Sequence, residues 1–297
     1  MLSNEPKTVL KKYGSSFFWA SQFLGENLSQ RIARLYKFCR YVDNIADSNQ
    51  PDRAIILQDI SNHLVKNDGR NRPKILYDFM LLADECALSL NTASELMAGM
   101  LSDQDEVEIN NETDLLRYCH AVAGTVGVMS KQILQCSNPQ ATYYAIDLGI
   151  AMQLTNIARD VLEDAKNSRR YIPESWLNLE PLEIAKMNND KRPMVSEAIN
   201  RLVKLADVYY ESAMTGIYHI PWRSRIAIVI ALRLYRQIGV QLVKNGSQWW
   251  KGRTIVKNHN KLLLTIYSMG AVMPKKVPPH NIYLHEKLHG LDGVHEL

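Results

Sequence analysis

Helical periodicity dominates this sequence and limits it to an all-α fold more strongly than any other feature. Apolar residues recur at intervals of three and four in segment after segment, and long alternating runs of β-branched residues are absent. Only 14 glycines and 11 prolines occur among 297 residues, which disfavours turn-rich all-β folds. We therefore expect an all-α bundle of roughly ten helices.

Turn signals cut the chain into helix-length pieces, for example at Ser137-Asn138-Pro139 and Asn245-Gly246. No linker or shift in composition marks a domain boundary. We expect residues 1–297 to form a single domain, with its core at about 10–265 and an irregular, loose tail at 274–297. The strongest patterns predict helices at residues 29–48, 74–101, 113–135, 140–166, 193–219 and 222–244.

Composition excludes several classes of protein. A hydrophobic content of 46% excludes a disordered chain. Four cysteines without a C-x-x-C pair in a chain of this length do not form a disulfide scaffold. The N-terminus lacks the apolar region of a signal peptide. The longest apolar run, Ile226 to Leu232, is far shorter than the roughly 20 residues that span a membrane. We expect a cytoplasmic protein, with peripheral membrane contact left open. The net charge of +4 is compatible with a basic cleft for a small anion.

The first informative helix carries two carboxylates one turn apart. At roughly 100° per residue, Tyr36, Arg40, Asp43 and Asp47 fall within a narrow arc. Both carboxylates can therefore reach the same point in space.

The second informative helix carries a polar stripe between apolar residues. Gln153, Asn156, Asp160 and Asp164 share one face, and the positions between them are of the kind that fills a core. Carboxylates four residues apart repel each other on a helix, so the stripe needs a counter-ion.

Oxygen ligands without histidine or cysteine suit hard cations such as Mg²⁺ or Mn²⁺, and Mg²⁺ in proteins usually bridges carboxylates to substrate phosphates. A single D-x-x-x-D pair is more often a solvated helix face. Two such pairs, both with buried-type polar neighbours, favour a site for metal-bridged phosphate, and nearby Arg40, Arg159, Lys166 and Arg169 could neutralise the remaining charge.

In these segments the sequence resembles the squalene/phytoene synthase family of head-to-head prenyl synthases. The stretch QLTNIARDVLEDAKNSRRYIP, from Gln153 to Pro173, closely matches the family's second aspartate-rich motif, and the segment around Asp43 and Asp47 matches the first. The resemblance covers about residues 10–265. Further matching elements are Ser16-Phe17 with Ala20, Gly99-Met100 with Asp103, Tyr118-Cys119 with Val122 to Gly127, Tyr235 and Arg253.

The resemblance implies an isoprenoid synthase helical bundle with a central cavity, and a prenyltransferase that uses Mg²⁺, with Mn²⁺ as a possible substitute. Two prenyl diphosphates would bind, and loss of one diphosphate would give an allylic cation that the second molecule attacks. The cyclopropyl diphosphate so formed would ionise and rearrange to the 1–1′ linked product. The implied partners are these substrates, with no nucleic acid, and the oligomeric state is left open.

Roles carry over by matching position. Metal would be held by Asp43, Asp47, Asn156, Asp160 and Asp164. Arg40 and Tyr36 would join the aspartates in catalysis, and aromatic faces would stabilise the cation. The substrates and their diphosphates would contact Phe17, Ser21, Ala33, Tyr118, Val122, Gly127, Gln153, Asn156, Arg159, Arg169, Tyr235 and Arg253.

Three positions depart from the family's pattern. Asn44 replaces a third carboxylate, although the D-x-x-x-D spacing survives. Ser15 stands where many members have a basic residue, so one phosphate contact is missing or replaced. Ser168 replaces a common glycine before Arg169, which would change the loop there.

The length of the substrate is inferred from two small residues. C15-using members often close the pocket floor with bulky aromatics at the positions of Ser21 and Ala33. Small side chains leave a deeper pocket, unless both positions merely pack helices. The expected substrate is therefore geranylgeranyl diphosphate and the expected product phytoene, the first committed step of carotenoid biosynthesis, without NADPH. The alternative is a C15-using squalene, dehydrosqualene or presqualene diphosphate synthase.

Two features bear on functions of a different class. His285 to His289 spell H-E-x-x-H, the spacing of a zinc protease helix, with His295 six residues later. Only eight residues follow His289, too few for a supporting element, so we expect no catalytic zinc. A non-catalytic assembly factor of the same fold should have lost carboxylates from one motif, whereas both pairs are intact. The basic stretch from Trp249 to Lys261 is the expected membrane-facing surface.

Overall fold

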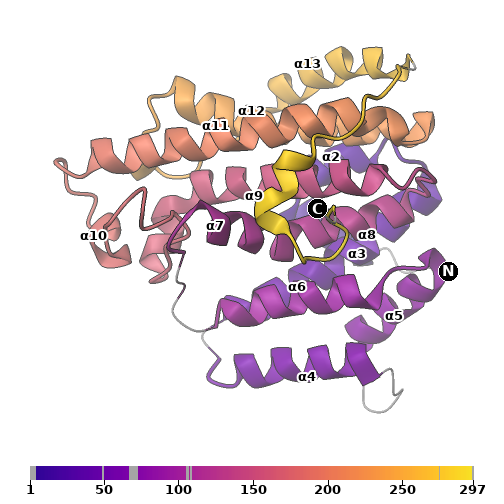
Figure 1. Ribbon diagram of the computed structural model, residues 1–297, viewed down its shortest axis with the longest axis horizontal. Coiled ribbons are helices and arrows are strands. Elements are labelled where there is room, and N and C mark those ends of the chain that lie inside the picture. The colour runs from indigo at the N-terminus through magenta and orange to yellow at the C-terminus, as the bar shows by residue number, and fades with distance from the viewer. Residues whose placement is uncertain are drawn as a thin grey trace.

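The computed structural model describes residues 5–48, 50–66, 73–104, 107, 109–273 and 275–295, and that part of the chain contains helices and no strand (Figure 1). The elements are α1 (Glu5–Tyr13), α2 (Ser15–Ser21), α3 (Glu26–Ala46), α4 (Arg53–Lys66), α5 (Lys74–Cys86), α6 (Leu90–Ser102), α7 (Glu112–Cys119), the π-helix η1 (His120–Gly124), α8 (Thr125–Ile133), α9 (Ala141–Lys166), α10 (Pro181–Ala185), α11 (Arg192–Gly216), η2 (Ile217–His219), α12 (Trp222–Lys244), η3 (Trp249–Lys251), α13 (Asn258–Ser268), η4 (Met269–Val272) and η5 (Ile282–Leu288).

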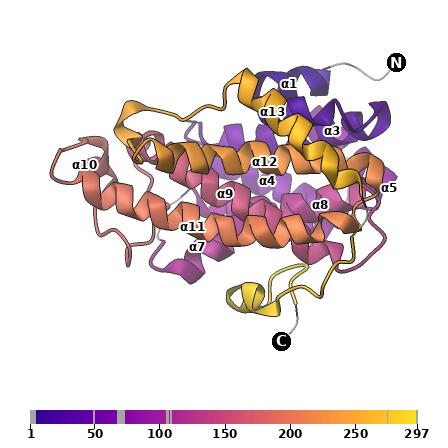
Figure 2. The ribbon, with the colours of Figure 1, turned by 90° about the horizontal axis from the view of Figure 1, so that it is seen from above.

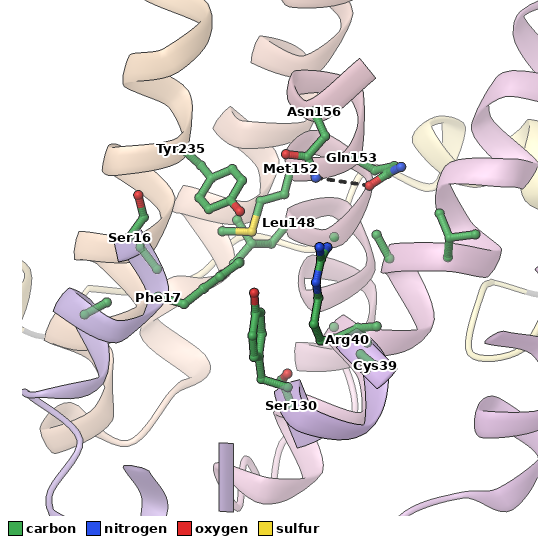
Figure 3. A pocket seen from close by; sticks show the side chains of 18 of the residues that line it. Ser16, Phe17, Cys39, Arg40, Ser130, Leu148, Met152, Gln153, Asn156 and Tyr235 are labelled. Atoms are coloured by element: carbon green, nitrogen blue, oxygen red, sulfur yellow. Dashed lines mark hydrogen bonds between the residues drawn. The ribbon is translucent and has the colours of Figure 1, made fainter. Parts of the chain in front are cut away.

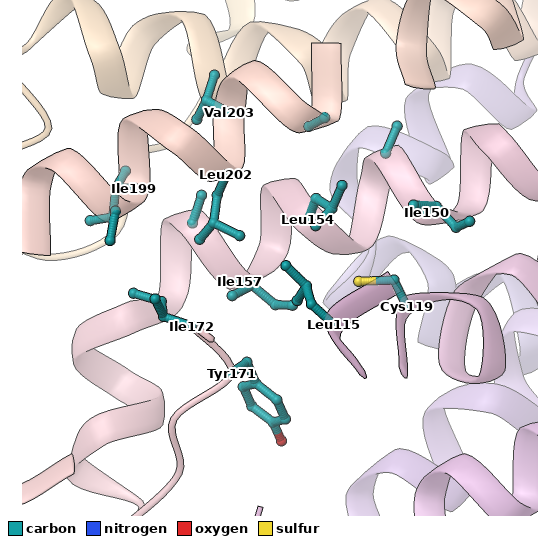
Figure 4. Close-up of a cluster of buried hydrophobic side chains, with 14 of the residues drawn as sticks. Leu115, Cys119, Ile150, Leu154, Ile157, Tyr171, Ile172, Ile199, Leu202 and Val203 are labelled. Atoms are coloured by element: carbon teal, nitrogen blue, oxygen red, sulfur yellow. The ribbon is translucent and has the colours of Figure 1, made fainter. Parts of the chain in front are cut away.

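Helix α9 lies at the centre of the bundle in both views, with α11 and α12 along one side (Figures 1 and 2). Its apolar residues pack against α11 and α7 in the largest hydrophobic core (Figure 4). Leu154 of α9, Leu202 of α11 and Leu115 of α7 are fully buried there. Burying a leucine stabilises a fold by roughly 1.5–3 kcal/mol, so this core holds α9 rigidly in place.

Two glycines allow α9 to approach its neighbours at backbone distance. A Cβ atom at Gly127 of α8 would lie 2.1 Å from the carbonyl oxygen of Ala145. A Cβ atom at Gly149 of α9 would lie 2.3 Å from that of Ala123. Both contacts are closer than any side chain tolerates, so only glycine fits these crossings.

The predicted helices at 140–166 and 222–244 correspond to α9 and α12. The predicted helix at 29–48 begins three residues earlier and ends at Ala46, and residues 193–219 form α11 followed by η2.

The prediction of one helix at 74–101 is wrong, because the chain turns between α5 and α6. Ala87 takes a left-handed conformation with φ of 51°, which ends α5. Ser89 then caps α6 by accepting a hydrogen bond from the backbone N–H of Thr92 at 3.2 Å. Neither glycine nor proline marks this break, so the pattern missed it.

The predicted helix at 113–135 is a continuous helical run with one irregular turn. Residues His120 to Gly124 form a π-helical turn between α7 and α8. Such insertions rotate the residues that follow and often occur at functional sites. Here Val122 and Ala123 line the cavity described below.

By length and composition α12 is the one described helix that could cross a membrane, with a mean hydropathy of 1.5 in its most apolar window. Half of that window is buried inside the bundle. Its Ile230, Leu232 and Leu234 are fully buried, as in a core helix.

Residues 275–295 differ from the loose tail expected from the sequence. They include the 3₁₀ helix η5, which packs against α7, and His280 and His285 reach Asp147 of α9. Figure 2 shows the segment at the outer edge of the bundle. Leu288 is fully buried, and Lys287 Nζ lies 2.6 Å from Glu112 Oε1 of α7. Because this packing uses only a few apolar side chains, it left little periodicity in the sequence.

Candidate active site

A cavity of about 810 Å³ runs along α9 and brings both aspartate-bearing helices together. On α9 its lining extends from Ala141 to Asp164, which is roughly 35 Å of helix at 1.5 Å per residue. Figure 3 shows Arg40 of α3, Gln153 and Asn156 of α9, and Tyr235 of α12 around it. Every site residue predicted from the sequence lines this cavity except Ala33.

Ala33, the second small residue that was expected to deepen the pocket and contact substrate, is not among the residues that line this cavity. Its side chain is fully buried and does not reach the cavity wall. Ser21 does line the cavity, and its hydroxyl donates to the carbonyl oxygen of Phe18 at 2.9 Å. Helical periodicity indicates on which side of α3 a residue lies, but it does not indicate how far that residue is from the cavity.

The first aspartate face is partly neutralised by arginine. Arg40 Nη1 donates to Asp43 Oδ2 at 2.6 Å, and Arg169, from the loop after α9, pairs with Asp47. Burial and the neighbouring charge of Asp47 nevertheless raise the pKa of Asp43 to about 6. The ionised form of Asp43 is therefore under-compensated in this arrangement.

The second aspartate face is split between one well-paired and one unpaired carboxylate. Arg159 and Arg253 each donate two hydrogen bonds to Asp160, at 2.6–2.8 Å. Burial would raise the pKa of Asp160, but these arginines hold it below its ordinary value. Burial and the charge of Asp160 raise the pKa of Asp164 well above its usual range, and no described residue forms an ion pair with it.

These side chains fit a divalent cation. Carboxylates from α3 and α9 face one cavity, and burial together with neighbouring carboxylates raises the pKa of two of them, Asp43 and Asp164. The amide of Asn156 donates to Gln153 Oε1 at 3.2 Å, which leaves its buried Oδ1 without a hydrogen-bond partner. An all-oxygen donor set with an orphaned acceptor is what a hard cation requires.

Aromatic rings border the charged region. The ring of Phe17 lies 4.9 Å from that of Tyr235 and 6.1 Å from that of Tyr36, measured between centroids. Burial raises the pKa of both tyrosines, so both hydroxyls stay protonated. The rings can face a cation without offering an anionic nucleophile.

Asp103 and Tyr171 lie in segments that match the family, but the sequence alone indicated no role for either. Tyr118 and Tyr171 stack at 4.9 Å and donate hydrogen bonds to Asp103 Oδ2 at 2.9 and 3.3 Å. Burial raises the pKa of Asp103 to about 6. This triad links α6, α7 and the loop after α9 beside the aspartates.

Lys261 was also missed. It was expected on a membrane-facing surface, but its side chain is buried and lines the cavity. Its Nζ lies 3.4 Å from the hydroxyl of Ser15, the position at which the family's basic residue is absent. Burial lowers the pKa of Lys261. Its distance along the chain from α2 hid this relationship.

Solved structures share the helical fold of this chain. A solved dehydrosqualene synthase superposes with a TM-score of 0.78 and 24% identity, over 90% of this chain and 94% of that one. A squalene synthase from Alicyclobacillus acidocaldarius gives 0.71 and 19%, over 82% and 94%. These likenesses establish the shared all-helical fold.

The sequence comparisons identify the family. The family model described as squalene/phytoene synthase matches residues 10–260, and the chain belongs to that family, whose members use a divalent metal. The chain is 32% identical to the 15-cis-phytoene synthase of Enterobacter agglomerans over 89% of its own length and 94% of that protein. It is 31% identical to the enzyme of the same name from Pantoea ananas, over 94% of each chain.

Proposed function

We propose that this protein is a prenyltransferase that joins two molecules of geranylgeranyl diphosphate head to head and forms phytoene, as the names of its relatives indicate. One observation carries the proposal. Two facing sets of carboxylates open onto a single cavity whose remaining length along α9 is lined by apolar residues such as Leu148 and Met152. Such a cavity suits a substrate with a highly charged head and a long hydrocarbon tail.

Mg²⁺ is the proposed metal, with Mn²⁺ as a substitute. Asp43, Asp47, Asp160, Asp164 and the Oδ1 atom of Asn156 would hold it. The metal would neutralise the diphosphate and so make it a better leaving group.

The arginines that now pair with the aspartates are the proposed diphosphate ligands. Arg159 and Arg253 lie on Asp160, and Arg169 lies on Asp47, at the mouth of the cavity. Guanidinium groups bind phosphate with two parallel hydrogen bonds, as they bind carboxylates. Each arginine could therefore exchange its carboxylate partner for the diphosphate without losing its hydrogen bonds. Lys261 supplies a further buried cation for the same anion.

The rest of the cavity protects and steers the carbocation. Phe17, Tyr36 and Tyr235 would stabilise the positive charge through their faces, and Ser21 leaves room for a C20 tail.

The metal assignment is tested with Asp164→Asn. Because the charge of Asp164 is repelled and unpaired, the variant should be at least as stable as the wild type to heat without metal, yet lose more than about 100-fold in turnover with Mg²⁺. Exposed Asp190→Asn should change neither quantity. Turnover at the wild-type rate in Asp164→Asn would overturn the assignment.

We also propose that the protein rests on a lipid surface through α13. Leu262, Leu263, Ile266 and Tyr267 are exposed on this helix, and exposed Ile255 beside it also lines the cavity. An exposed apolar helix face next to the cavity mouth would give oily substrates and products a direct route to the bilayer.

Vesicle sedimentation tests this surface. Leu263→Glu and Ile266→Glu together should reduce binding to anionic vesicles by about 10-fold or more. Leu182→Glu, at an equally exposed leucine on α10, should bind like the wild type. Equal binding by all proteins would contradict the proposal.

A further inference from the structure

Three histidines of the C-terminal segment meet on the outer side of α9. His280, His285 and His295 each place one ring nitrogen within 4.8 Å of the others. The H-E-x-x-H spacing does not describe this cluster, because Glu286 and His289 are exposed and lie outside it. The grouping depends on how residues 275–295 fold back onto α9.

Asp147 of α9 anchors two of these rings. Its carboxylate is fully buried and lies 2.7 Å from His280 Nε2 and 3.0 Å from His285 Nε2. The hydroxyl of Ser212 donates to the same carboxylate. At these distances Asp147 accepts an N–H from each imidazole and fixes both ring orientations.

The Nδ1 atoms of His280 and His285 point into the cluster with free lone pairs if each ring donates its Nε2 proton to Asp147. A neutral imidazole that donates from Nε2 carries a lone pair on Nδ1. His280 Nδ1 lies 3.0 Å from His295 Nε2, while the buried His285 Nδ1 has no hydrogen-bond partner. A buried acceptor without a partner is unfavourable, so a metal ion at this atom would stabilise the cluster.

We propose that His280, His285 and His295 bind one transition-metal ion, with Zn²⁺ as the best match. Zn–N bonds of about 2.0–2.1 Å place the nitrogens of a tetrahedral site roughly 3.4 Å apart. The present separations of 3.0 Å and up to 4.8 Å need shifts on the order of 1 Å. An all-imidazole donor set favours Zn²⁺, Cu²⁺ or Ni²⁺ over Mg²⁺.

The surroundings match those of a metal centre. Asp147 accepts the second ring N–H of two ligands, the carboxylate–histidine arrangement that orients metal-binding imidazoles. Tyr143 stacks on His295 at 3.5 Å.

This site is separate from the aspartate cavity. Asp147 and Asp160 stand 13 residues apart on α9, roughly 20 Å along the axis. The neighbouring Tyr144 lines the far end of the cavity, and its hydroxyl donates to the carbonyl oxygen of Pro278 at 2.8 Å. Bound metal would fasten the segment 275–295 to α9 behind this end of the cavity.

Metal titration tests the proposal on full-length protein without a histidine tag, stripped with a chelator and kept in excess Mg²⁺ to occupy the carboxylates. Calorimetry with Zn²⁺ should show one tight equivalent, and Co²⁺ should give the intense visible absorption of a tetrahedral nitrogen site. His295→Gln should weaken binding by at least about 100-fold, because even outer-shell changes cost 10–100-fold. His289→Gln, an exposed histidine of the same segment, is the matched control and should bind like the wild type.

Thermal unfolding gives a second measurement. Zn²⁺ binds the folded state and should raise the Tm of the wild type and of His289→Gln, but not that of His295→Gln. His295 is the least buried of the three ligands, and circular dichroism verifies that the variant folds. Equal Zn²⁺ affinity in both variants, or no tight equivalent in the wild type, would overturn the proposal.

Discussion

At the scale of single residues, arginines neutralise only part of the negative charge of the candidate site. Asp160 is shared by two arginines, and Asp43 and Asp47 each pair with one, whereas Asp164 has no ion pair among the described residues. A bound cation would pair with the carboxylates, and a bound diphosphate would pair with the arginines. Burial first, and then the neighbouring carboxylates, raise the pKa values of Asp43 and Asp164, so a bound cation would favour their ionised forms.

Ser168 offers a test of backbone strain beside the site. Its φ is +59°, a left-handed conformation that serine adopts at a cost and glycine adopts freely. Ser168→Gly should raise the free energy of unfolding by about 1 kcal/mol, measured by urea denaturation. Ser61→Gly, within helix α4, should lower it by a similar amount. A loss of stability in Ser168→Gly would contradict the strain.

The raised pKa of Asp103 predicts how the stability of the fold depends on pH. Its folded-state pKa of about 6 exceeds its unfolded value, so the folded protein binds the extra proton and gains stability as the pH falls from about 7 to 4.5. Asp103→Asn lacks this gain. The stability of the wild type minus that of the variant should therefore increase as pH falls, and a flat or decreasing difference in urea unfolding would exclude the raised pKa.

At the scale of elements, α9 serves two sides of the molecule. One side carries Gln153, Asn156, Asp160 and Asp164 into the cavity, and another presents Asp147 to the C-terminal segment. Contacts with α11 and the π-helical turn hold the helix between these sides. Its position consequently decides whether the two aspartate faces can meet.

Gly127 tests the close approach of α8 to α9. In Gly127→Ala the new Cβ would lie 2.1 Å from the carbonyl oxygen of Ala145, so the helices must separate. We expect a loss of about 1–3 kcal/mol in unfolding free energy, with reduced turnover because α9 moves. Gly270→Ala, where nothing lies within 4 Å, is the control. Equal stability of the two variants would show that the crossing is not tight.

At the scale of the whole molecule, the local patterns predicted the all-α class, and the two aspartate faces do meet in one cavity. What the sequence could not predict depends on packing between distant segments. Lys261 reaches Ser15 across 246 positions, and the histidine cluster needs residues 275–295 to fold onto α9. Ala33 failed as a lining residue for the same reason, because a helical face does not give distance from a cavity.

Product identification most directly tests the central claim, that the cavity joins two C20 diphosphates. The purified protein would receive equal amounts of farnesyl and geranylgeranyl diphosphate with Mg²⁺ and without NADPH, and the extracted lipids would be identified by mass. We predict a C40 hydrocarbon as the main product, and none when Mg²⁺ is removed by a chelator. A C30 hydrocarbon or presqualene diphosphate as the main product, or no condensation at all with the metal present, would contradict the claim.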